Sequence, residues 1–377
     1  MPQLSVMIKP ASSLCNMRCE YCFYHSLSES RETYSYGVMS ESTALSIIKK
    51  AADFTNGAPL HFAFQGGEPT VAGLDFFKFF ANAVKTYVTK SKVTFSLQTN
   101  GLLIDDDWAK FFAENKFLIG LSLDGDPENN QYRIDAGGKY TTERVIHAAE
   151  ILNAFGVPFN ILSVATKMTA ERLDSVLEYY SKHDFKYIQF IPCLKPFGVE
   201  SDKYAMDEDE FAAFLIAAWK RYAAAFYNRK PISIRFFDNL LMMATGERAE
   251  QCGLYGHCGI QFIIEGNGDV FPCDFYCLDE WKLGNINDMS FLEIATSPRA
   301  KKFIEESLPV RPECKSCSFY RLCLGGCKRY LADLDYCKVM KTFFTAVLPS
   351  LHQIATFLKQ NRWPIAQPPR GWRVSPK

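Results

Sequence analysis

The distribution of cysteine is the feature that most constrains this sequence. Of 13 cysteines among 377 residues, three lie within eight residues near the N-terminus and nine lie between Cys252 and Cys337, with none between Cys22 and Cys193. The first residues, MPQLSVMIKPASS, contain no charged region followed by an apolar core, so we expect no secretory signal and a cytoplasmic location. Because disulfides are rare in that compartment, the clustered thiols are interpreted as metal ligands.

Composition excludes several classes of function. Lys plus Arg and Asp plus Glu each number 42, so the chain has no basic excess with which to bind nucleic acid. Hydrophobic residues make up 48% of the chain, which is enough for a large core. No run of about 18 apolar residues predicts a membrane-spanning helix.

The first part of the chain alternates short apolar runs with longer amphipathic segments. Helices are expected to begin near Asp105–Asp107 and Thr141–Thr142. Strands are predicted at 4–9, 60–65, 93–98, 117–124, 159–165 and 187–191. This alternation is typical of a parallel sheet covered by helices. Six such units up to about residue 228 predict an α/β fold, an open and partial (β/α)6 TIM-like barrel.

Distinctive motifs follow the ends of these predicted strands, where ligands collect in such folds. The cysteine triplet follows the first strand, Gln65-Gly66-Gly67-Glu68-Pro69 the second, and Gln98-Thr99-Asn100-Gly101 the third. Ser122 ends the fourth strand and Leu194 follows the sixth. We therefore predict that these residues share one edge of the sheet.

From about residue 230 cysteine, glycine and turn residues increase. The segments 261–265 and 269–271 flank Gly266-Asn267-Gly268, which predicts a hairpin. We predict a barrel domain over 1–230, a smaller cysteine-rich domain over 231–362 and a C-terminal tail over 363–377.

The N-terminal triplet, Cys15-x3-Cys19-x2-Cys22, can hold one metal centre. With His25 as a fourth ligand it could bind structural zinc. Alternatively, three cysteines can hold a four-iron, four-sulfur cluster whose fourth iron stays open to a substrate or cofactor. The glycines after the second strand favour the second interpretation, because they let a ligand approach the backbone closely.

Together, the triplet and Gly66-Gly67-Glu68-Pro69 resemble the radical S-adenosylmethionine (SAM) enzymes. The resemblance implies a [4Fe-4S] cluster on the triplet and bound SAM. It implies cofactor contacts at these matching positions: Tyr21, Gly67, Glu68, Ser122, Arg133 and Leu194. Arg133 suits the methionine carboxylate, since a guanidinium can bind it bidentately. The alternatives are a surface arginine at 133, a helix-capping Glu68 and a hydrogen-bonded Ser122 at a strand end.

The C-terminal cysteines have spacings that also fit two zinc ribbons. The pattern Cys-x9-Gly-x4-Cys, then Cys-x2-Cys-x5-Cys-x3-Cys and a last Cys, resembles the SPASM extension of radical SAM enzymes. That resemblance implies two auxiliary [4Fe-4S] clusters, and so three in all. The first would use Cys252, Cys258, Cys273 and Cys327, and the second Cys314, Cys317, Cys323 and Cys337. Cys193 and Cys277 are left as buried, inert thiols.

Almost the whole chain resembles the anaerobic sulfatase-maturating enzymes, through segments such as CNMRCEYCFYH, FAFQGGEPTVAG and FPCDFYCLDEWKLGNI. The resemblance implies oxidation of a Cys or Ser in an unfolded client sulfatase segment, Cys/Ser-x-Pro-x-Arg, to Cα-formylglycine. A 5′-deoxyadenosyl radical would take hydrogen from Cβ, Asp274 would act as base, and auxiliary clusters would take the second electron. An external electron donor and an anaerobic host are expected. The alternatives are another SPASM peptide maturase and a non-enzymatic zinc-binding interaction protein.

Overall fold

The computed structural model describes residues 3–361, which fold into two compact units. The first unit comprises the residues up to Ser122, Tyr132–Phe159 and Gly259–Glu305. The second comprises Leu123–Gln131, Asn160–Cys258 and the residues from Glu306. Both units take segments from either side of residue 230, so the domain boundary proposed there stays a prediction. The tail predicted at 363–377 lies outside the described residues.

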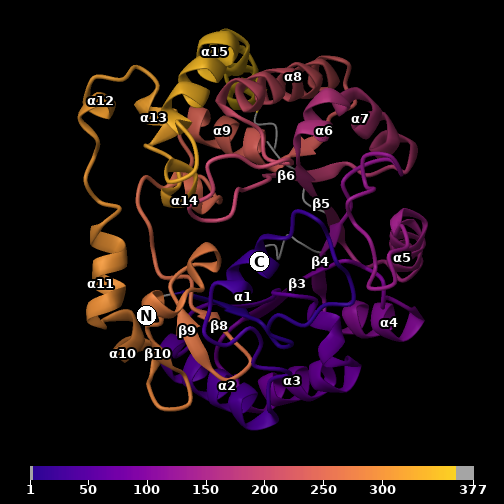
Figure 1. The fold of residues 1–377 in the computed structure, drawn as a ribbon, viewed down its shortest axis with the longest axis vertical. Helices are drawn as coiled ribbons and strands as arrows, with labels where there is room; N and C mark the ends of the chain where they lie inside the picture. The colour runs from indigo at the N-terminus through magenta and orange to yellow at the C-terminus, as the bar shows by residue number, and fades with distance from the viewer. Residues whose placement is uncertain (1–2, 362–377) are drawn as a thin grey trace. The chain divides into compact units, whose positions relative to one another are not determined.

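The first unit is built on a run of parallel strands (Figure 1). Neighbouring strands pair in parallel in the order β1 (Leu4–Ile8), β2 (Leu60–Phe64), β3 (Val93–Thr99) and β4 (Phe117–Ser122). On its other side β1 pairs in parallel with β8 (Ile263–Ile264), which lies within the predicted hairpin segment 261–265; the sequence did not predict this pairing with β1. The predicted hairpin is confirmed, because β9 (Asp269–Phe271) is antiparallel to β8 and to β10 (Gly284–Asn285).

Polar side chains cap some of the helices of the first unit. Ser40 accepts the amide of Thr43 ahead of one helix, and Asp105 accepts that of Trp108 where a helix was expected to begin. The α-helices are α1 (Phe23–Glu29), α2 (Glu41–Thr55), α3 (Leu74–Tyr87), α4 (Asp106–Glu114), α5 (Thr142–Ala154), α10 (Phe291–Ala295) and α11 (Pro298–Glu305). Single 3-10 turns are η1 (Pro69–Ala72), η3 (Asp274–Tyr276) and η4 (Asp279–Trp281).

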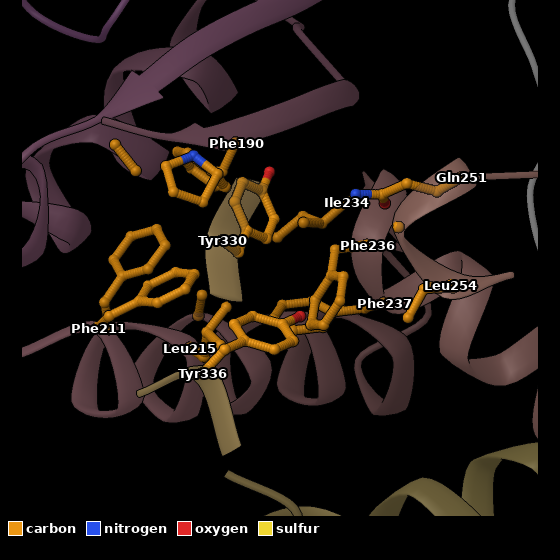
Figure 2. A pocket seen from close by; sticks show the side chains of 15 residues that line it. Phe190, Phe211, Leu215, Ile234, Phe236, Phe237, Gln251, Leu254, Tyr330 and Tyr336 are labelled. Atoms are coloured by element: carbon orange, nitrogen blue, oxygen red, sulfur yellow. The ribbon is translucent and has the colours of Figure 1, made fainter. Parts of the chain in front are cut away.

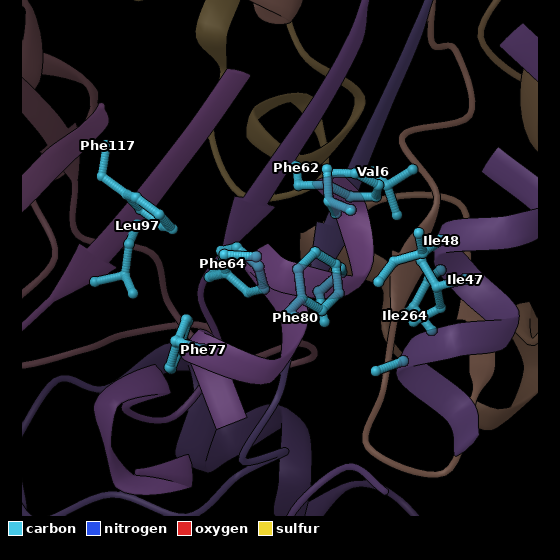
Figure 3. Close-up of a cluster of buried hydrophobic side chains, with 14 of the residues drawn as sticks. Val6, Ile47, Ile48, Phe62, Phe64, Phe77, Phe80, Leu97, Phe117 and Ile264 are labelled. Carbon is cyan, nitrogen blue, oxygen red and sulfur yellow. The ribbon is translucent and has the colours of Figure 1, made fainter. Parts of the chain in front are cut away.

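Aromatic side chains fill the core of the first unit (Figure 3). Alternate residues of β2 are buried, as expected for a strand whose successive side chains point to opposite faces. Phe64 meets Phe77 and Phe80 edge to face, with ring centroids 5.0 and 5.1 Å apart. This packing fixes the end of β2, from which the glycine-rich loop leaves.

The second unit contains the remaining parallel strands. β6 (Tyr187–Pro192) pairs with β5 (Phe159–Ala165) and with β7 (Ser233–Ile234), a short strand that the sequence did not predict. All six predicted strands are therefore present, each within two residues of its predicted ends. The helical segments are α6 (Lys167–Glu171), α7 (Leu173–Lys182), α8 (Glu208–Tyr227), α9 (Arg235–Thr245), η2 (Cys252–Leu254), α12 (Pro312–Lys315), α13 (Tyr320–Cys323), α14 (Lys328–Leu331) and α15 (Tyr336–Asn361).

A buried carboxyl lies in the helical layer of the second unit. Asp238 on α9 accepts hydrogen bonds from Tyr222 Oη at 2.6 Å and Ser233 Oγ at 2.5 Å. Burial raises its pKa to about 7, helped by the charge of Glu250 and opposed by the two hydrogen bonds. The folded chain therefore holds this proton at a pH where an unfolded aspartate has released it.

Asp238→Asn is expected to change the pH dependence of stability. Between about pH 4 and pH 7 the folded state binds one more proton than the unfolded state, so the contribution of Asp238 falls as the pH rises through this window. As the pH rises from 6 to 8, the free energy of unfolding of the variant should increase by on the order of 1 kcal/mol relative to that of wild type. Thermal unfolding at both pH values measures this gain, with the exposed Asp184→Asn as control. Parallel shifts in wild type and D238N would contradict the assignment.

Candidate active site

The cysteine triplet lies in the loop between β1 and α1, and Cys22 is the N-cap of that helix. The surrounding protein raises the pKa of Cys15 to about 12, chiefly by desolvating the thiol and also through the charges of Glu68 and Cys22. The Cys15 sulfur accepts the Met17 amide at 3.4 Å, and Asn100 Nδ2 lies 3.9 Å away at the end of β3. The thiols of Cys15 and Cys22 are thus neighbours, as a shared centre requires.

The glycine-rich loop after β2 docks directly on the cysteine loop. The Gly67 amide donates to Ser12 O at 2.9 Å, and the Glu68 amide donates to Leu14 O at 2.8 Å. A Cβ atom at position 67 would lie 2.2 Å from Leu14 O, closer than any side chain allows. Only glycine therefore permits this contact, which holds the backbone just ahead of Cys15.

Glu68 is buried and its carboxylate has several donors. It caps η1 by accepting from Thr70, and it also accepts from Thr99 Oγ1 at 2.7 Å and the Asn100 amide at 2.7 Å. Burial raises its pKa, and these hydrogen bonds oppose the rise. The structure therefore shows Glu68 as a cap that ties the end of β2 to the end of β3, and a contact with the cofactor stays a prediction.

The other predicted cofactor residues divide between the units. In the first unit Ser122 ends β4, and Arg133 is only 8% exposed, so the surface-arginine alternative is wrong. The Arg133 guanidinium lies 5.6 Å from the centre of the Tyr21 ring, over its face. Leu194 lies in the second unit and is buried there.

Asp274 begins η3, directly after Cys273. One carboxylate oxygen, Oδ2, accepts the Tyr24 hydroxyl at 2.6 Å. Burial and the charge of Asp274 raise the pKa of Tyr24 well above its ordinary value, which keeps the phenol a donor. The other oxygen, Oδ1, accepts no hydrogen bond and lies 3.4 Å from Lys9 Nζ. One oxygen is thus held by a hydrogen bond, and the other is buried beside Lys9 without one.

Lys9 is a buried cation that sequence analysis missed. Its Nζ lies 3.3 Å from Cys277 Sγ, 3.4 Å from Asp274 Oδ1 and 3.5 Å from Glu265 Oε1. Burial lowers its pKa, but the charges of these three neighbours outweigh burial and raise it above the ordinary value. Lys9 therefore stays charged. Its one sequence signal is a lysine directly after an apolar strand.

Glu265, at the end of β8, was missed as well. It accepts Arg31 Nη1 at 2.6 Å and Ser12 Oγ at 2.8 Å. Burial raises its pKa, but Lys9 and Arg31 outweigh burial and lower it. The buried group thus contains two cations, Lys9 and Arg31, and two carboxylates.

Within the second unit the cysteines form two groups. The charges of Cys314, Cys337 and Cys317 add to burial in raising the pKa of Cys323 to about 11. Burial and the charges of Cys252 and Cys258 likewise raise the pKa of Cys327 to about 11. Cys273 belongs to the first unit, and all thirteen cysteines are free thiols.

The remaining candidates have ordinary surroundings. Cys193 and Cys277 are buried, as expected, and Cys277 Sγ lies 3.6 Å from Cys273 O. His25 is exposed beside Glu29, 3.4 Å away. Between residues 3 and 361 no three His, Cys, Asp or Glu side chains converge on a point that one metal ion could occupy. In the same range no helix has the length and apolar character needed to cross a membrane.

An apolar cavity of about 40 Å³ lies inside the second unit (Figure 2). Side chains of β6, α8 and α9 line it, among them Phe190, Phe211 and Phe237, together with Tyr330 and Tyr336. It has no charged lining residue that could transfer a proton. We interpret it as a packing feature, because small apolar cavities stay empty of water.

Comparison with known proteins gives consistent matches. The radical SAM superfamily model matches residues 10–180, and the model of SPASM, an iron-sulfur cluster-binding domain, matches 257–318. A cysteine-type anaerobic sulfatase-maturating enzyme of Clostridium perfringens is 43% identical over 95% of this chain and 100% of that protein. A serine-type enzyme of Bacteroides thetaiotaomicron is 29% identical over 92% and 90%. The solved structure of native anSMEcpe with bound AdoMet and Cp18Cys peptide has a TM-score of 0.90 and 42% identity, covering 95% of this chain and 100% of that one.

Gly67→Ala is expected to disrupt the cysteine loop. The added methyl group would meet the Leu14 carbonyl, so the loop must shift, at about 1–3 kcal/mol for such overpacking. Iron content after anaerobic reconstitution and the thermal midpoint should both fall. Gly259→Ala is the matched control, since its Cβ would meet nothing within 4 Å. Wild-type iron content in G67A would show that the docking contact is dispensable.

Proposed function

We propose that this chain, which belongs to the family of anaerobic sulfatase-maturating enzymes, oxidises a cysteine rather than a serine in its client. The observation that carries the cysteine preference is the difference in identity, 43% to the cysteine-type relative against 29% to the serine-type relative. The client segment is an unfolded stretch of sulfatase with the pattern Cys-x-Pro-x-Arg. The reaction occurs in the cytoplasm and draws its electrons from an external donor.

Family membership establishes the architecture and the cofactor class. The chain is an α/β enzyme with a radical SAM partial barrel and a SPASM domain, so the predicted fold class is confirmed. The zinc-binding alternative is wrong, because the SPASM model describes an iron-sulfur cluster-binding domain. Its cofactors are SAM and three [4Fe-4S] clusters.

The residues present suit these groups. Cys15, Cys19 and Cys22 share one short loop that Gly67 holds in place, and they would carry the cluster that works with SAM. When bound, this pair supplies the 5′-deoxyadenosyl radical that removes a hydrogen atom from the client's Cβ. Arg133, which is buried and lies over the face of the Tyr21 ring, offers a guanidinium for the methionine carboxylate.

Asp274 supplies the base in this proposal. Tyr24 holds Oδ2, Lys9 lies beside Oδ1, and the carboxylate takes the proton of the client thiol. Loss of a hydrogen atom from Cβ, this proton and one electron, which the auxiliary clusters would accept, converts the thiol to a thioaldehyde. Hydrolysis of the thioaldehyde releases sulfide and leaves formylglycine.

The reaction is tested on anaerobically reconstituted protein with SAM, a reductant and two peptides that differ only in Cys or Ser. We expect a hydrazine-trapped aldehyde by mass spectrometry, formed faster from the Cys peptide. Equal rates would contradict the cysteine preference. Deoxyadenosine without aldehyde would overturn the proposed substrate and favour another SPASM peptide maturase.

Asp274→Asn should lower the rate of aldehyde formation by about 10²–10⁴-fold, the usual contribution of a general base. The cysteine triplet is unchanged in this variant, so SAM cleavage should persist. Product and deoxyadenosine are quantified together by mass spectrometry. Asp288→Asn, at an exposed position of the same unit, is the control. A D274N rate near wild type would exclude Asp274 as the base.

A further inference from the structure

The buried charged side chains near Asp274 form a continuous series of ion pairs. Arg31 contacts Glu265 at 2.6 Å, Lys9 contacts Glu265 at 3.5 Å, and Lys9 contacts Asp274 at 3.4 Å. All four residues belong to the first unit, and their formal charges sum to zero. Buried ions are costly unless they are paired, so this arrangement keeps each charge beside an opposite one.

The side chains at the start of this series of ion pairs are held by contacts that do not involve Asp274. Glu265 is fixed independently of Lys9, by Arg31 on Oε1 and by Ser12 on Oε2. Lys9 Nζ donates a hydrogen bond to Cys277 Sγ and forms ion pairs with Glu265 Oε1 and Asp274 Oδ1, all within 3.5 Å. The ring of Tyr24 lies 4.9 Å from the same nitrogen. Lys9 is therefore held at a defined point beside Asp274.

Glu265 does not need Lys9 as its partner, because Arg31 is nearer and donates a hydrogen bond. For Asp274 the situation differs. Within residues 3–361, Lys9 is the one basic side chain that forms an ion pair with Asp274. Asp274 also accepts a hydrogen bond from the Tyr24 hydroxyl, but this bond holds only Oδ2.

We propose that Lys9 is the positioning residue of Asp274, holding Oδ1 so that the carboxylate keeps the orientation from which it accepts the client's proton. This inference rests on the proposed function. Tyr24 and Lys9 then fix the two oxygens of one carboxylate, Tyr24 by a hydrogen bond to Oδ2 and Lys9 by an ion pair with Oδ1. Losing Lys9 leaves the base in place but free to rotate.

The test uses Lys9→Met in the full-length, cluster-loaded protein, with the Cys-x-Pro-x-Arg peptide. We expect kcat for formylglycine to fall about 10–100-fold with little change in the peptide KM, because orientation of the base matters in the transition state. Deoxyadenosine should still form, so its ratio to formylglycine should rise. A kcat and ratio equal to wild type would overturn the proposal.

A double-mutant cycle separates action through Asp274 from independent action. In the D274N background, K9M should change the residual rate less than about twofold, since the group that Lys9 positions is already lost. An equal fold-loss in both backgrounds would overturn the positioning role. If wild type forms no formylglycine, the proposed function itself fails; if wild type does and K9M matches it, only the Lys9 inference fails.

A second variant guards against simple misfolding. K9M leaves one unbalanced carboxylate, whereas Lys9→Met combined with Glu265→Gln leaves only Arg31 and Asp274, which balance. This double variant should regain thermal stability and iron content relative to K9M, yet remain as slow as K9M in forming formylglycine. Recovery of activity along with stability would mean that Lys9 serves Glu265 alone, and would refute the proposal.

Discussion

The contact between Gly67 and the backbone of Ser12 and Leu14 is the constraint on which the site of the first unit depends. Parallel strands bring the loops after β1 and β2 to one edge, but only a residue without a side chain lets the two backbones meet. Once they meet, Glu68 lies within reach of Thr99 and Asn100, and the loop after β3 is joined as well. Three successive strand ends thus become one rigid support for the cysteine triplet.

Sequence patterns predicted the regular part of this arrangement well. Strand β2 alternates buried and half-buried residues, and its predicted and observed ends differ by one residue. Strands β7 and β8 are two residues long, too short to carry a period; β7 was missed, and β8 was expected only as the arm 261–265 of a hairpin. Their place in a sheet depends on pairing with β6 and β1, which no local pattern encodes.

The cysteine groups illustrate a second limit of sequence patterns. Cys323 and Cys327 are four residues apart, yet they have different thiol neighbours in the second unit. Between them Leu324, Gly325 and Gly326 all have positive φ, so the chain turns sharply after α13. Spacing alone cannot reveal such a turn, and the grouping could be anticipated only through the resemblance to SPASM proteins. Sequence analysis missed Lys9 and Glu265 for a similar reason, because the residues that they contact are distant in sequence.

Stability alone does not explain the buried charges around Asp274. Replacing buried ion pairs by apolar residues is often neutral or stabilising by about 1–4 kcal/mol. Lys9 directly follows the apolar strand β1, so an apolar residue would also suit position 9. A charge group of this kind is expected where a carboxylate must be kept inside the protein in one orientation. Asp274 is such a carboxylate, held through one oxygen and unbonded through the other. The ion pairs from Arg31 through Glu265 to Lys9 then allow Asp274, the proposed base, to be buried beside Cys273.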